Sequence, residues 1–376
     1  MAISAAGIIF SSLNSNTLSR LTGDRTVAAI PFACRYRLID FSLSNMVHAN
    51  ITNINIVANY NFRSLAEHIG SGKDWDLARR AGGINFVSPY GTAHSASAKL
   101  YSTHMEALMS MKEYIDEIRE DTVVLMDSDT VFSIDLTDVI RQHEMTGANV
   151  TFVTKLVASD YSSKTSRLML SSVAGKVTDM ALSSTYNERD PELSLSVLVM
   201  KTAYLRKLIE EAAAYGINSL TSVLLHNYKY ENYRTYCYDG YAASVSSFLD
   251  YYRRSMELVG NADARESLLG KKDAPILTKV HNSAPTLYKA GAHVENSMIA
   301  DDCVIEGTVI NSVLYRGVHI AKGAVVRNSV LFYGTRVEKN ASLNCIVTDK
   351  FVTVTDGVEL SGNPNMPFYV QKGRRV

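Results

Sequence analysis

Two acidic side chains lie two residues apart, directly after an apolar segment. Asp127 and Asp129 follow residues 122–126, a run that is apolar enough to predict a buried strand. Two carboxylates at a strand end could bind a divalent cation such as Mg²⁺. A helix cap or a solvated loop acid is the alternative interpretation of these residues.

Three basic side chains, Arg25, Arg35 and Arg37, gather near the amino terminus. The whole chain carries 38 Lys and Arg against 38 Asp and Glu, so its formal net charge is zero. Such a balance argues against a nucleic-acid backbone or an anionic membrane as partner. An anionic ligand must therefore be met by a local cluster like this one, although surface ion pairs of little energetic weight are the alternative.

The elements that position these residues change character along the chain. Up to about residue 258, short apolar runs at 7–10, 54–60, 122–126, 150–156 and 196–200 predict strands, and several are continuous enough to be buried on both faces. Apolar residues recur at helical spacing in 105–118 and 245–256. This alternation predicts an α/β, Rossmann-like domain with a mostly parallel sheet, in which ligands bind in the loops after Phe10 and Met126.

The last ninety residues repeat every six positions instead. Apolar series with this period end in Gly-containing turns, which is typical of a left-handed parallel β-helix of hexapeptide repeats; the series are Met298, Val304 and Ile310; Val325, Leu331, Val337 and Leu343; and Ile346, Val352 and Val358. A small β-sandwich is the alternative. Residues 260–289 lack clear periodicity, so we predict domains at 1–259 and 290–376 joined by a linker at 260–289.

One long segment resembles a known enzyme family. Residues 31–45 read PFACRYRLIDFSLSN, which is similar to the PFGGRYRLIDFxLSN block of glucose-1-phosphate adenylyltransferases, also called ADP-glucose pyrophosphorylases. Further matches to that family follow in order at 60–69, 126–136 and 251–258, and a hexapeptide β-helix completes its architecture. The resemblance thus extends over essentially the whole chain.

The resemblance implies a reaction that joins glucose 1-phosphate to the α-phosphate of ATP and releases pyrophosphate. Such chemistry requires close approach of backbone amides to phosphates, cationic side chains on those phosphates, and two carboxylates for Mg²⁺. The first metal carboxylate of the family matches Asp129. His104 falls in the segment that seats the base and ribose, where it is interpreted as a surface helix residue rather than a replacement ligand.

Most other catalytic positions of the family are substituted here. The glycine-rich phosphate turn corresponds to the Ser/Asn-rich stretch 12–16, which has no glycine, and its arginine to Thr17. The lysine near the α-phosphate is Val27, the lysine for the sugar phosphate is Ser183, and the second metal aspartate is Ser244. Because losses of several charge-stabilising contacts leave little rate, we expect no useful catalysis from this chain alone.

The expected role is therefore a regulatory, largely non-catalytic subunit in bacterial glycogen biosynthesis. It would modulate a catalytic adenylyltransferase subunit, as a heterotetramer or after self-association, with no cofactor of its own and Mg²⁺ bound only in the partner. An active sugar-nucleotide transferase with a rebuilt site remains an alternative. A hexapeptide acyltransferase or β-helical metal enzyme would rest on His281, His293 and His319, whose spacings place them at unrelated coil positions.

The resemblance also suggests an effector site. In the family, basic residues of the amino-terminal segment take part in binding phosphorylated effectors, and Arg25 and Arg37 match such positions, whereas Asp24 replaces a basic residue. We expect these two arginines to contribute to an anion-binding effector site.

Two further features bear on the compartment. The cysteines Cys34, Cys237, Cys303 and Cys345 lie far apart without CxxC spacing, which suits reduced thiols better than disulfides or zinc. The first apolar run is too short for a signal-peptide core or a spanning helix. We therefore expect a cytoplasmic protein.

Overall fold

The computed structural model describes residues 3–11, 16–89, 100–157, 162–185 and 191–376. The chain forms two compact units, one of Met1–Leu13 and Phe41–Ala242 and the other of Asn14–Asp40 and Ala243–Val376. The predicted division into 1–259, 260–289 and 290–376 follows chain order, whereas the segment 14–40 belongs to the same compact unit as the carboxyl-terminal part. The Ser/Asn-rich loop at 12–15 lies outside the described residues.

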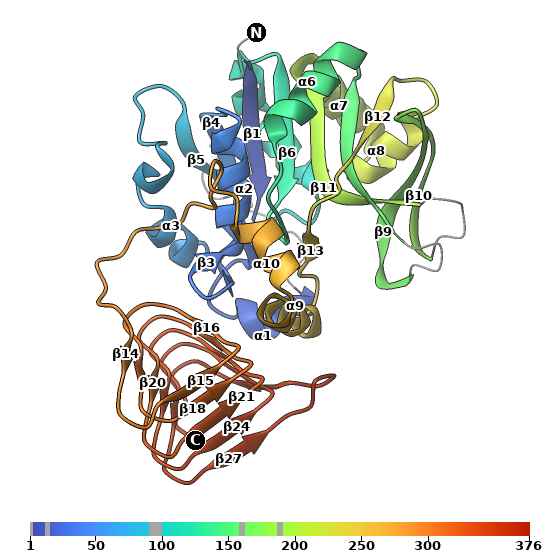
Figure 1. The fold of residues 1–376 in the computed structure, drawn as a ribbon. Helices are drawn as coiled ribbons and strands as arrows, with labels where there is room; N and C mark the ends of the chain where they lie inside the picture. Colours follow the sequence, from blue (N-terminus) through green and yellow to red (C-terminus); the bar gives the residue numbers. More distant parts are fainter. Residues whose placement is uncertain (1–2, 12–15, 90–99, 158–161, 186–190) are drawn as a thin grey trace. The chain divides into compact units, whose positions relative to one another are not determined.

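The first unit is built on a nine-stranded mixed sheet (Figure 1). The strand order is β5 (Gly83–Val87), β4 (Asn53–Val57), β1 (Ala5–Phe10), β6 (Thr122–Asp127), β11 (Glu192–Lys201), β8 (Val150–Leu156), β12 (Tyr233–Cys237), β10 (Lys176–Thr185) and β9 (Ser162–Val173). The pairings β5–β4, β4–β1, β1–β6 and β8–β12 are parallel, and those made by β11 and between β9, β10 and β12 are antiparallel. The predicted α/β class and all five predicted strands are confirmed, while the antiparallel pairings make the sheet mixed rather than mostly parallel.

The helices of the first unit supply its core from their apolar faces. They are α3 (Arg63–Ile69), α4 (His104–Ser110), α5 (Lys112–Glu117), α6 (Leu136–Thr146), α7 (Thr202–Tyr215) and α8 (Leu220–Asn227), with the 3₁₀ helix η3 (Lys73–Trp75) and the short strand β7 (Thr130–Phe132). Met105, Leu108 and Ile115 are fully buried and share a core cluster with Ile8 of β1 and Leu205 of α7. The helical spacing in 105–118 thus marks a buried helical face, divided between α4 and α5 at Met111.

The second unit carries a parallel β-helix of three five-stranded sheets (Figure 1). The first sheet contains β14 (Leu287–Tyr288), β17 (Val304–Ile305), β20 (His319–Ile320), β23 (Arg336–Val337) and β26 (Thr353–Val354). The second contains β15 (His293–Glu295), β18 (Thr308–Ile310), β21 (Val325–Arg327), β24 (Ser342–Asn344) and β27 (Glu359–Ser361). The third contains β16 (Met298–Ile299), β19 (Val313–Leu314), β22 (Val330–Leu331), β25 (Ile346–Thr348) and β28 (Phe368–Val370). The predicted β-helix is therefore confirmed.

A ladder of serines fixes one corner of the β-helix. The backbone N–H of Ser312 donates to Ser297 Oγ at 3.1 Å, that of Ser329 to Ser312 Oγ at 3.2 Å, and that of Ile346 to Ser329 Oγ at 3.1 Å. The residues before these serines, Asn296, Asn311 and Asn328, have positive φ, which asparagine tolerates better than other side chains. Successive coils at this corner are thus hydrogen-bonded through serine hydroxyls, of which those of Ser312 and Ser329 are buried.

The remaining elements of the second unit come from the amino-terminal segment and from the stretch before the β-helix. They are η1 (Asn16–Leu18), α1 (Ser19–Thr22), η2 (Val27–Ala29), β2 (Pro31–Phe32), β3 (Tyr36–Arg37), α9 (Phe248–Gly260) and α10 (Ala262–Leu269). The elements α2 (Leu38–His48) and β13 (Ala242–Ser244) span the borders between the two units. Helix α9 begins after Ser247, whose hydroxyl accepts from the Asp250 N–H at 3.1 Å. The Tyr251 hydroxyl donates to the Pro31 carbonyl at 2.9 Å, and that of Tyr252 to the Asn328 carbonyl at 2.8 Å, so α9 connects segment 14–40 to the β-helix.

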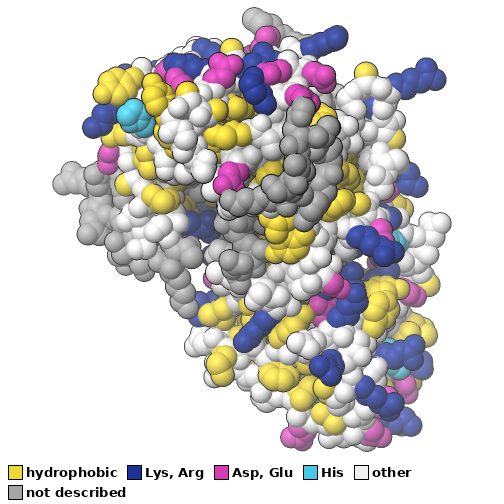
Figure 2. Space-filling model, turned by 180° about the vertical axis from the view of Figure 1, so that it is seen from behind, with side chains coloured by type: hydrophobic (Ala, Val, Ile, Leu, Met, Phe, Trp, Pro, Cys, Tyr) yellow, Lys and Arg dark blue, Asp and Glu magenta, His cyan; other side chains and the backbone are white. Residues whose placement is uncertain are grey.

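The surface shows no single field of charge on the face seen in Figure 2. Basic and acidic side chains are interspersed there, in keeping with the zero formal net charge. Within the described part of the chain, no helix has the length and apolar character needed to cross a membrane.

Candidate functional site

A small pocket lies in the first unit at the carboxyl ends of β1 and β6, where the sequence predicts ligand binding. Its volume is about 100 Å³. It is lined by Phe10, His104, Leu125, Met126, Asp127, Arg167, Leu168, Ser194, Ser196, Leu198, Leu220, Thr221 and Leu224. Apolar walls from β6, β11 and α8 thus surround a few charged and hydroxyl groups.

His104 and Asp127 form an ion pair in this pocket. Helix α4 begins at His104, and the Thr103 hydroxyl caps it by accepting from the Glu106 N–H at 3.1 Å. His104 Nε2 lies 2.7 Å from Asp127 Oδ1, and the imidazole meets the Phe10 ring edge-on at 4.6 Å. Burial lowers the pKa of His104, but the Asp127 carboxylate more than offsets this and raises it overall. The predicted surface residue is therefore a half-buried partner of Asp127.

Asp129 is buried beside this pair, with 8% of its surface exposed. Burial and the Asp127 carboxylate raise its pKa to about 6, although Arg167, the Thr130 hydroxyl and His104 act in the opposite direction. The Thr130 hydroxyl donates to Asp129 Oδ1 at 3.1 Å, whereas helix α6 is capped by Asp135. Asp129 is thus neither a solvated loop acid nor the cap of that helix.

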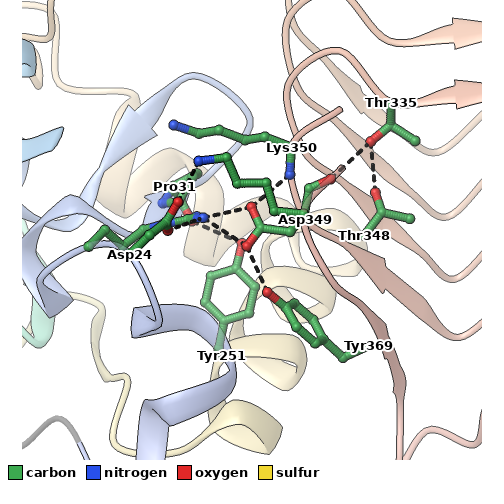
Figure 3. A network of polar contacts seen from close by, with 10 residues as sticks. Asp24, Pro31, Tyr251, Thr335, Thr348, Asp349, Lys350 and Tyr369 are labelled. Carbon is green, nitrogen blue, oxygen red and sulfur yellow. Dashed lines mark hydrogen bonds and ion pairs between the residues drawn. The ribbon is translucent and has the colours of Figure 1, made fainter. Parts of the chain in front are cut away.

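A second charged cluster lies in the second unit around Arg25, which is 2% exposed. Its Nη2 donates to both carboxylate oxygens of Asp349 at 2.7 Å, and its Nε and Nη2 bond to Asp24 Oδ1 at 3.1 and 3.0 Å. Figure 3 shows the Asp349 carboxylate at the centre of this network, where it also accepts from the Tyr369 hydroxyl at 2.6 Å. Among the described residues, Arg25 Nη1 alone of these nitrogens has no hydrogen-bond partner.

Two lysines, Lys372 and Lys350, also belong to this charged cluster. Lys372 Nζ lies 2.5 Å from Asp24 Oδ2. Burial raises the pKa of Asp24, but Lys372 and Arg25 more than offset this and lower the pKa to about 2. Burial, with Arg37 and Arg25 close by, lowers the pKa of Lys350 to about 8. Arg37 is half-buried, and its backbone N–H donates to Asp40 Oδ2 at 2.9 Å. The structure therefore brings Arg25, Arg37 and Lys350 into one cationic cluster.

An open groove of about 910 Å³ adjoins this cluster within the second unit. Its lining includes the cationic side chains Arg20, Lys372, Arg374 and Arg375 and the carboxylates Asp24 and Asp349. Positive charge therefore exceeds negative charge along the groove. Arg35, by contrast, is exposed and lies over the ring of Tyr36 at 5.6 Å.

Comparison with known proteins places both units in one family. Residues 6–164 match the nucleotidyl transferase family, and residues 283–366 match the GlmU-like, C-terminal hexapeptide family. Glycogen biosynthesis protein GlgD of Bacillus subtilis (strain 168) is 31% identical over 98% of this chain and 95% of its own length. That of Geobacillus stearothermophilus is 34% identical over 98% and 96%. The chain belongs to the GlgD and glucose-1-phosphate adenylyltransferase family. The glucose-1-phosphate adenylyltransferase of Bacillus thuringiensis (strain Al Hakam) is 27% identical over 93% of this chain and 92% of its own length.

The four positions that the sequence resemblance predicts to be substituted have ordinary structural surroundings. Val27 is buried in η2 with 3% of its surface exposed. The Thr17 hydroxyl donates to the Ser246 carbonyl at 2.5 Å. Ser183 is half-buried in β10, and Ser244 is half-buried in β13. None of the four side chains carries a charge that could meet a phosphate or a metal ion.

The residues present do not fit the Mg²⁺ site that the adenylyltransferase family implies. Magnesium is bound through carboxylates that are free to accept it, but the Asp127 carboxylate is already paired with His104. Among the described residues, no group of three or more His, Cys, Asp or Glu side chains could hold a metal ion. His293 and His319 of the β-helix therefore belong to no such group.

Sequence reasoning missed two features of the pocket. Arg167 of β9 lies directly opposite Ser183 of β10 in the antiparallel ladder. Ser196 has a φ of 57° in an irregularity of β11 between Ser194 and Val197. Arg167 and Ser183 lie in one hairpin with a two-residue turn at Ala174 and Gly175, both of positive φ, so the glycine of this turn is the local signal that could have paired the two strands.

Proposed function

We propose that this chain is a regulatory, largely non-catalytic subunit of glucose-1-phosphate adenylyltransferase in bacterial glycogen biosynthesis. It modulates a catalytic partner subunit, which supplies the Mg²⁺-dependent chemistry, in a hetero-oligomer such as a heterotetramer. The observation that carries the proposal is the burial of Val27 at the position of the family's α-phosphate lysine. A core valine cannot neutralise charge on a transferring nucleotide.

The pocket of the first unit supports the same conclusion. In the family this region seats a nucleotide, but here the His104 imidazole occupies one wall and is paired with Asp127. Ser183 provides a hydroxyl where a lysine would meet the sugar phosphate. With both lysines and the second metal carboxylate absent, the transition state loses several contacts that commonly contribute about 3 kcal/mol each, although such losses are not additive.

The regulatory part of the proposal rests on the Arg25 cluster and its groove. A phosphorylated metabolite could reach Arg37, Lys350 and the cationic groove, whereas Arg25 is 2% exposed and acts through its ion pairs. Arg25 is also a buried ion-pair member, so its removal would disturb folding as well as binding. Arg37 is therefore the residue on which the effector role should be tested.

The first test measures ADP-glucose formation and pyrophosphate release from ATP, glucose 1-phosphate and Mg²⁺. We expect none from the purified chain, with a catalytic homologue from the same cell as the positive control. Turnover within tenfold of an ordinary enzyme, which is about 10 s⁻¹, would overturn the proposal.

The second test mixes the chain with that catalytic homologue and titrates glycolytic phosphates and nucleotides. We expect the mixture to differ from the partner alone in activity and effector affinity by roughly 5- to 150-fold, the usual range of allosteric coupling. Arg37→Ala should reduce the difference, whereas Arg35→Ala, which removes an exposed arginine nearby, should not. Identical behaviour of the mixture and the partner alone toward every effector would rule out modulation.

A further inference from the structure

A groove of about 550 Å³ lies at the edge of the first unit's sheet where β1 begins, at the opposite edge from the pocket. Ile3 and Ala49 are among its apolar lining residues, and helix α6, which lies beside the start of β1 in Figure 1, forms one wall with Arg141, Glu144 and Met145. Because the six residues of β1 rise about 3.3 Å each, roughly 20 Å separate the groove from the pocket. A molecule bound in the groove would therefore leave the pocket open.

Helix α6 carries an exposed face beside the groove. Another face of the helix packs on β8 and β11 through four buried side chains, Leu136, Val139, Ile140 and His143. Arg141 and Met145 are one helical turn apart on the exposed face, where the Arg141 side chain is 63% exposed and Met145 is 79% exposed. An exposed methionine forgoes the free energy that burial would provide, and methionine is common on surfaces that bind other proteins. This face is therefore suited to contact with another molecule.

The charges of this face are poorly matched inside the chain. Arg141 Nη1 lies 3.9 Å from Asp138 Oδ1, which is a long contact, and Asp138 Oδ2 already accepts from the Tyr236 hydroxyl at 2.8 Å. Glu144 is exposed, and its carboxylate forms no ion pair with any residue that the structure describes. Arg141 and Glu144 are three positions apart, so they are neighbours on the helix surface. One basic and one acidic group are thus available to a partner.

These features are complementary to a second copy of the same surface. A two-fold axis near the middle of α6, between residues 142 and 143, would place two α6 helices side by side and antiparallel. Arg141 of each copy would then meet Glu144 of the other, because the two positions are equally far from the axis. An isologous interface needs both members of each contact on one patch, and α6 supplies both. A partner with charge of one sign would leave one of these two groups unmatched.

We propose that helix α6 and the adjoining groove form a two-fold interface between two copies of this chain. Reciprocal Arg141–Glu144 ion pairs lie at its centre, and Met145 of each copy enters the groove of the other and packs near Ile3. Eleven residues give α6 a length of about 16 Å, which is short for an interface of roughly 800 Å² per partner. The carboxyl end of α2, which lines the other side of the groove at His48, must therefore belong to the contact.

The mass of the purified full chain, measured by light scattering after size-exclusion chromatography, tests this interface. We expect the unmodified chain to associate, and the mass to fall by half in Arg141→Glu, in Glu144→Arg and in Met145→Glu. Each charge reversal creates two like-charged contacts across the axis, so association should weaken at least about tenfold. Arg63→Glu reverses the charge of a 91% exposed arginine on α3 and should leave the mass unchanged.

Mixing the two charge-reversal variants gives the sharpest result. Arg141→Glu carries two acidic groups on the patch and Glu144→Arg carries two basic groups, so each variant repels itself and attracts the other. An equimolar mixture should therefore recover the mass of the unmodified chain, and the double variant Arg141→Glu, Glu144→Arg should recover it alone. All three substituted positions are exposed, so circular dichroism should show that every variant is folded.

Three results would overturn the inference: a single-chain mass for the unmodified protein, the same mass in every variant, or failure of the mixture to recover association. Loss of binding to a catalytic homologue in these variants, with no self-association of the unmodified chain, would assign the groove to that subunit instead of a second copy.

The inference does not depend on the proposed function, and the two can fail separately. Pyrophosphate release by the associated chain would overturn the non-catalytic role and leave the interface intact. Modulation of a catalytic subunit by a chain whose mass is the same in every variant would overturn the interface and support the regulatory role.

Discussion

The two charged clusters of this protein differ in how their arginines are partnered. In the second unit, Arg25 is matched by Asp349 and Asp24 through four charge-assisted hydrogen bonds. In the first unit, Arg167 faces a pocket with a buried nitrogen that has no partner among the described residues. Each of the two guanidinium groups thus has one buried nitrogen without a partner among the described residues, but Arg25 is in addition held by two carboxylates. The predictions below test this difference, from the largest expected effect to the smallest.

The largest effect should come from breaking the Arg25–Asp349 pair. Asp349→Ala leaves a guanidinium buried without its main partner, and we expect the free energy of unfolding to fall by about 3–5 kcal/mol. Urea unfolding of the isolated chain measures this change. Replacing both residues in the variant Arg25→Met, Asp349→Leu should recover most of the loss, since no charge then remains buried. A loss below 1 kcal/mol for Asp349→Ala would show that the cluster is not structural.

The Asp129 carboxylate should lower the stability of the fold at neutral pH, because burial disfavours its charged form. Its folded pKa of about 6 exceeds the ordinary value of 3.8, so the unfolded chain releases the proton first and stability falls as pH rises between about 4 and 6. Asp129→Asn should therefore raise the free energy of unfolding by roughly 1–3 kcal/mol at pH 7.5 and have little effect at pH 4. Thermal unfolding at both pH values measures the difference.

Asp129→Asn also probes function. Assembly with a catalytic subunit, and its modulation, should remain unchanged if the carboxylate is a relic of the metal site. A large loss of activity in the mixed complex would show instead that this carboxylate still binds something functional.

The sequence predicted the strands and the β-helix better than the contacts of the site residues. The strand at 150–156 has the predicted bounds, and the six-residue period predicted the β-helix, because both patterns reflect local burial. The period assigned Val304 and Ile310 to the core, yet Ile305 and Val309 are the fully buried residues. Successive serines of the corner ladder are 15 or 17 residues apart, so the coils are shorter than three full hexapeptides and the phase shifts.

The site residues depended on contacts that no local pattern encodes. Arg25 and Asp349 are 324 positions apart, and a buried ion pair at that separation leaves no periodic signal. Arg167 lies opposite Ser183 in a hairpin, where a shift of the strand register between Val177 and Asp179 alters the pairing that the turn alone would predict. The sequence predicted His104 to be a surface helix residue, but its imidazole pairs with Asp127 at the end of β6.

A smaller effect is expected for the His104–Asp127 pair, because both side chains are partly exposed to solvent. His104→Gln should lower the free energy of unfolding by about 1 kcal/mol at pH 6. The raised pKa of His104 means that the pair stabilises the fold fully below pH 6.5 and loses this contribution as pH rises through the folded value. A double-mutant cycle with Asp127→Asn at pH 6 and pH 9 measures the coupling, which should shrink at the higher pH. Equal coupling at both values would show that the pair is a neutral hydrogen bond.

The smallest effect should come from the outer contact of the Arg25 cluster, between Lys372 and Asp24. Both side chains are about half exposed, so Lys372→Ala should lower the free energy of unfolding by less than about 1 kcal/mol, far below the effect of Asp349→Ala. Asp24 has a folded pKa of about 2, below its ordinary value of 3.8, so its contribution is present above pH 4 and is lost as pH falls through 2. Acid therefore weakens this cluster, whereas rising pH weakens the pocket of the first unit, and the two regions should have stability profiles of opposite slope. Acid titration of the Lys372→Ala chain, followed by circular dichroism, should show its acid transition moved to slightly higher pH, with no change between pH 6 and 9. A change in that neutral range would place Lys372 in contact with a group other than Asp24 and would weaken the separation drawn between the two clusters.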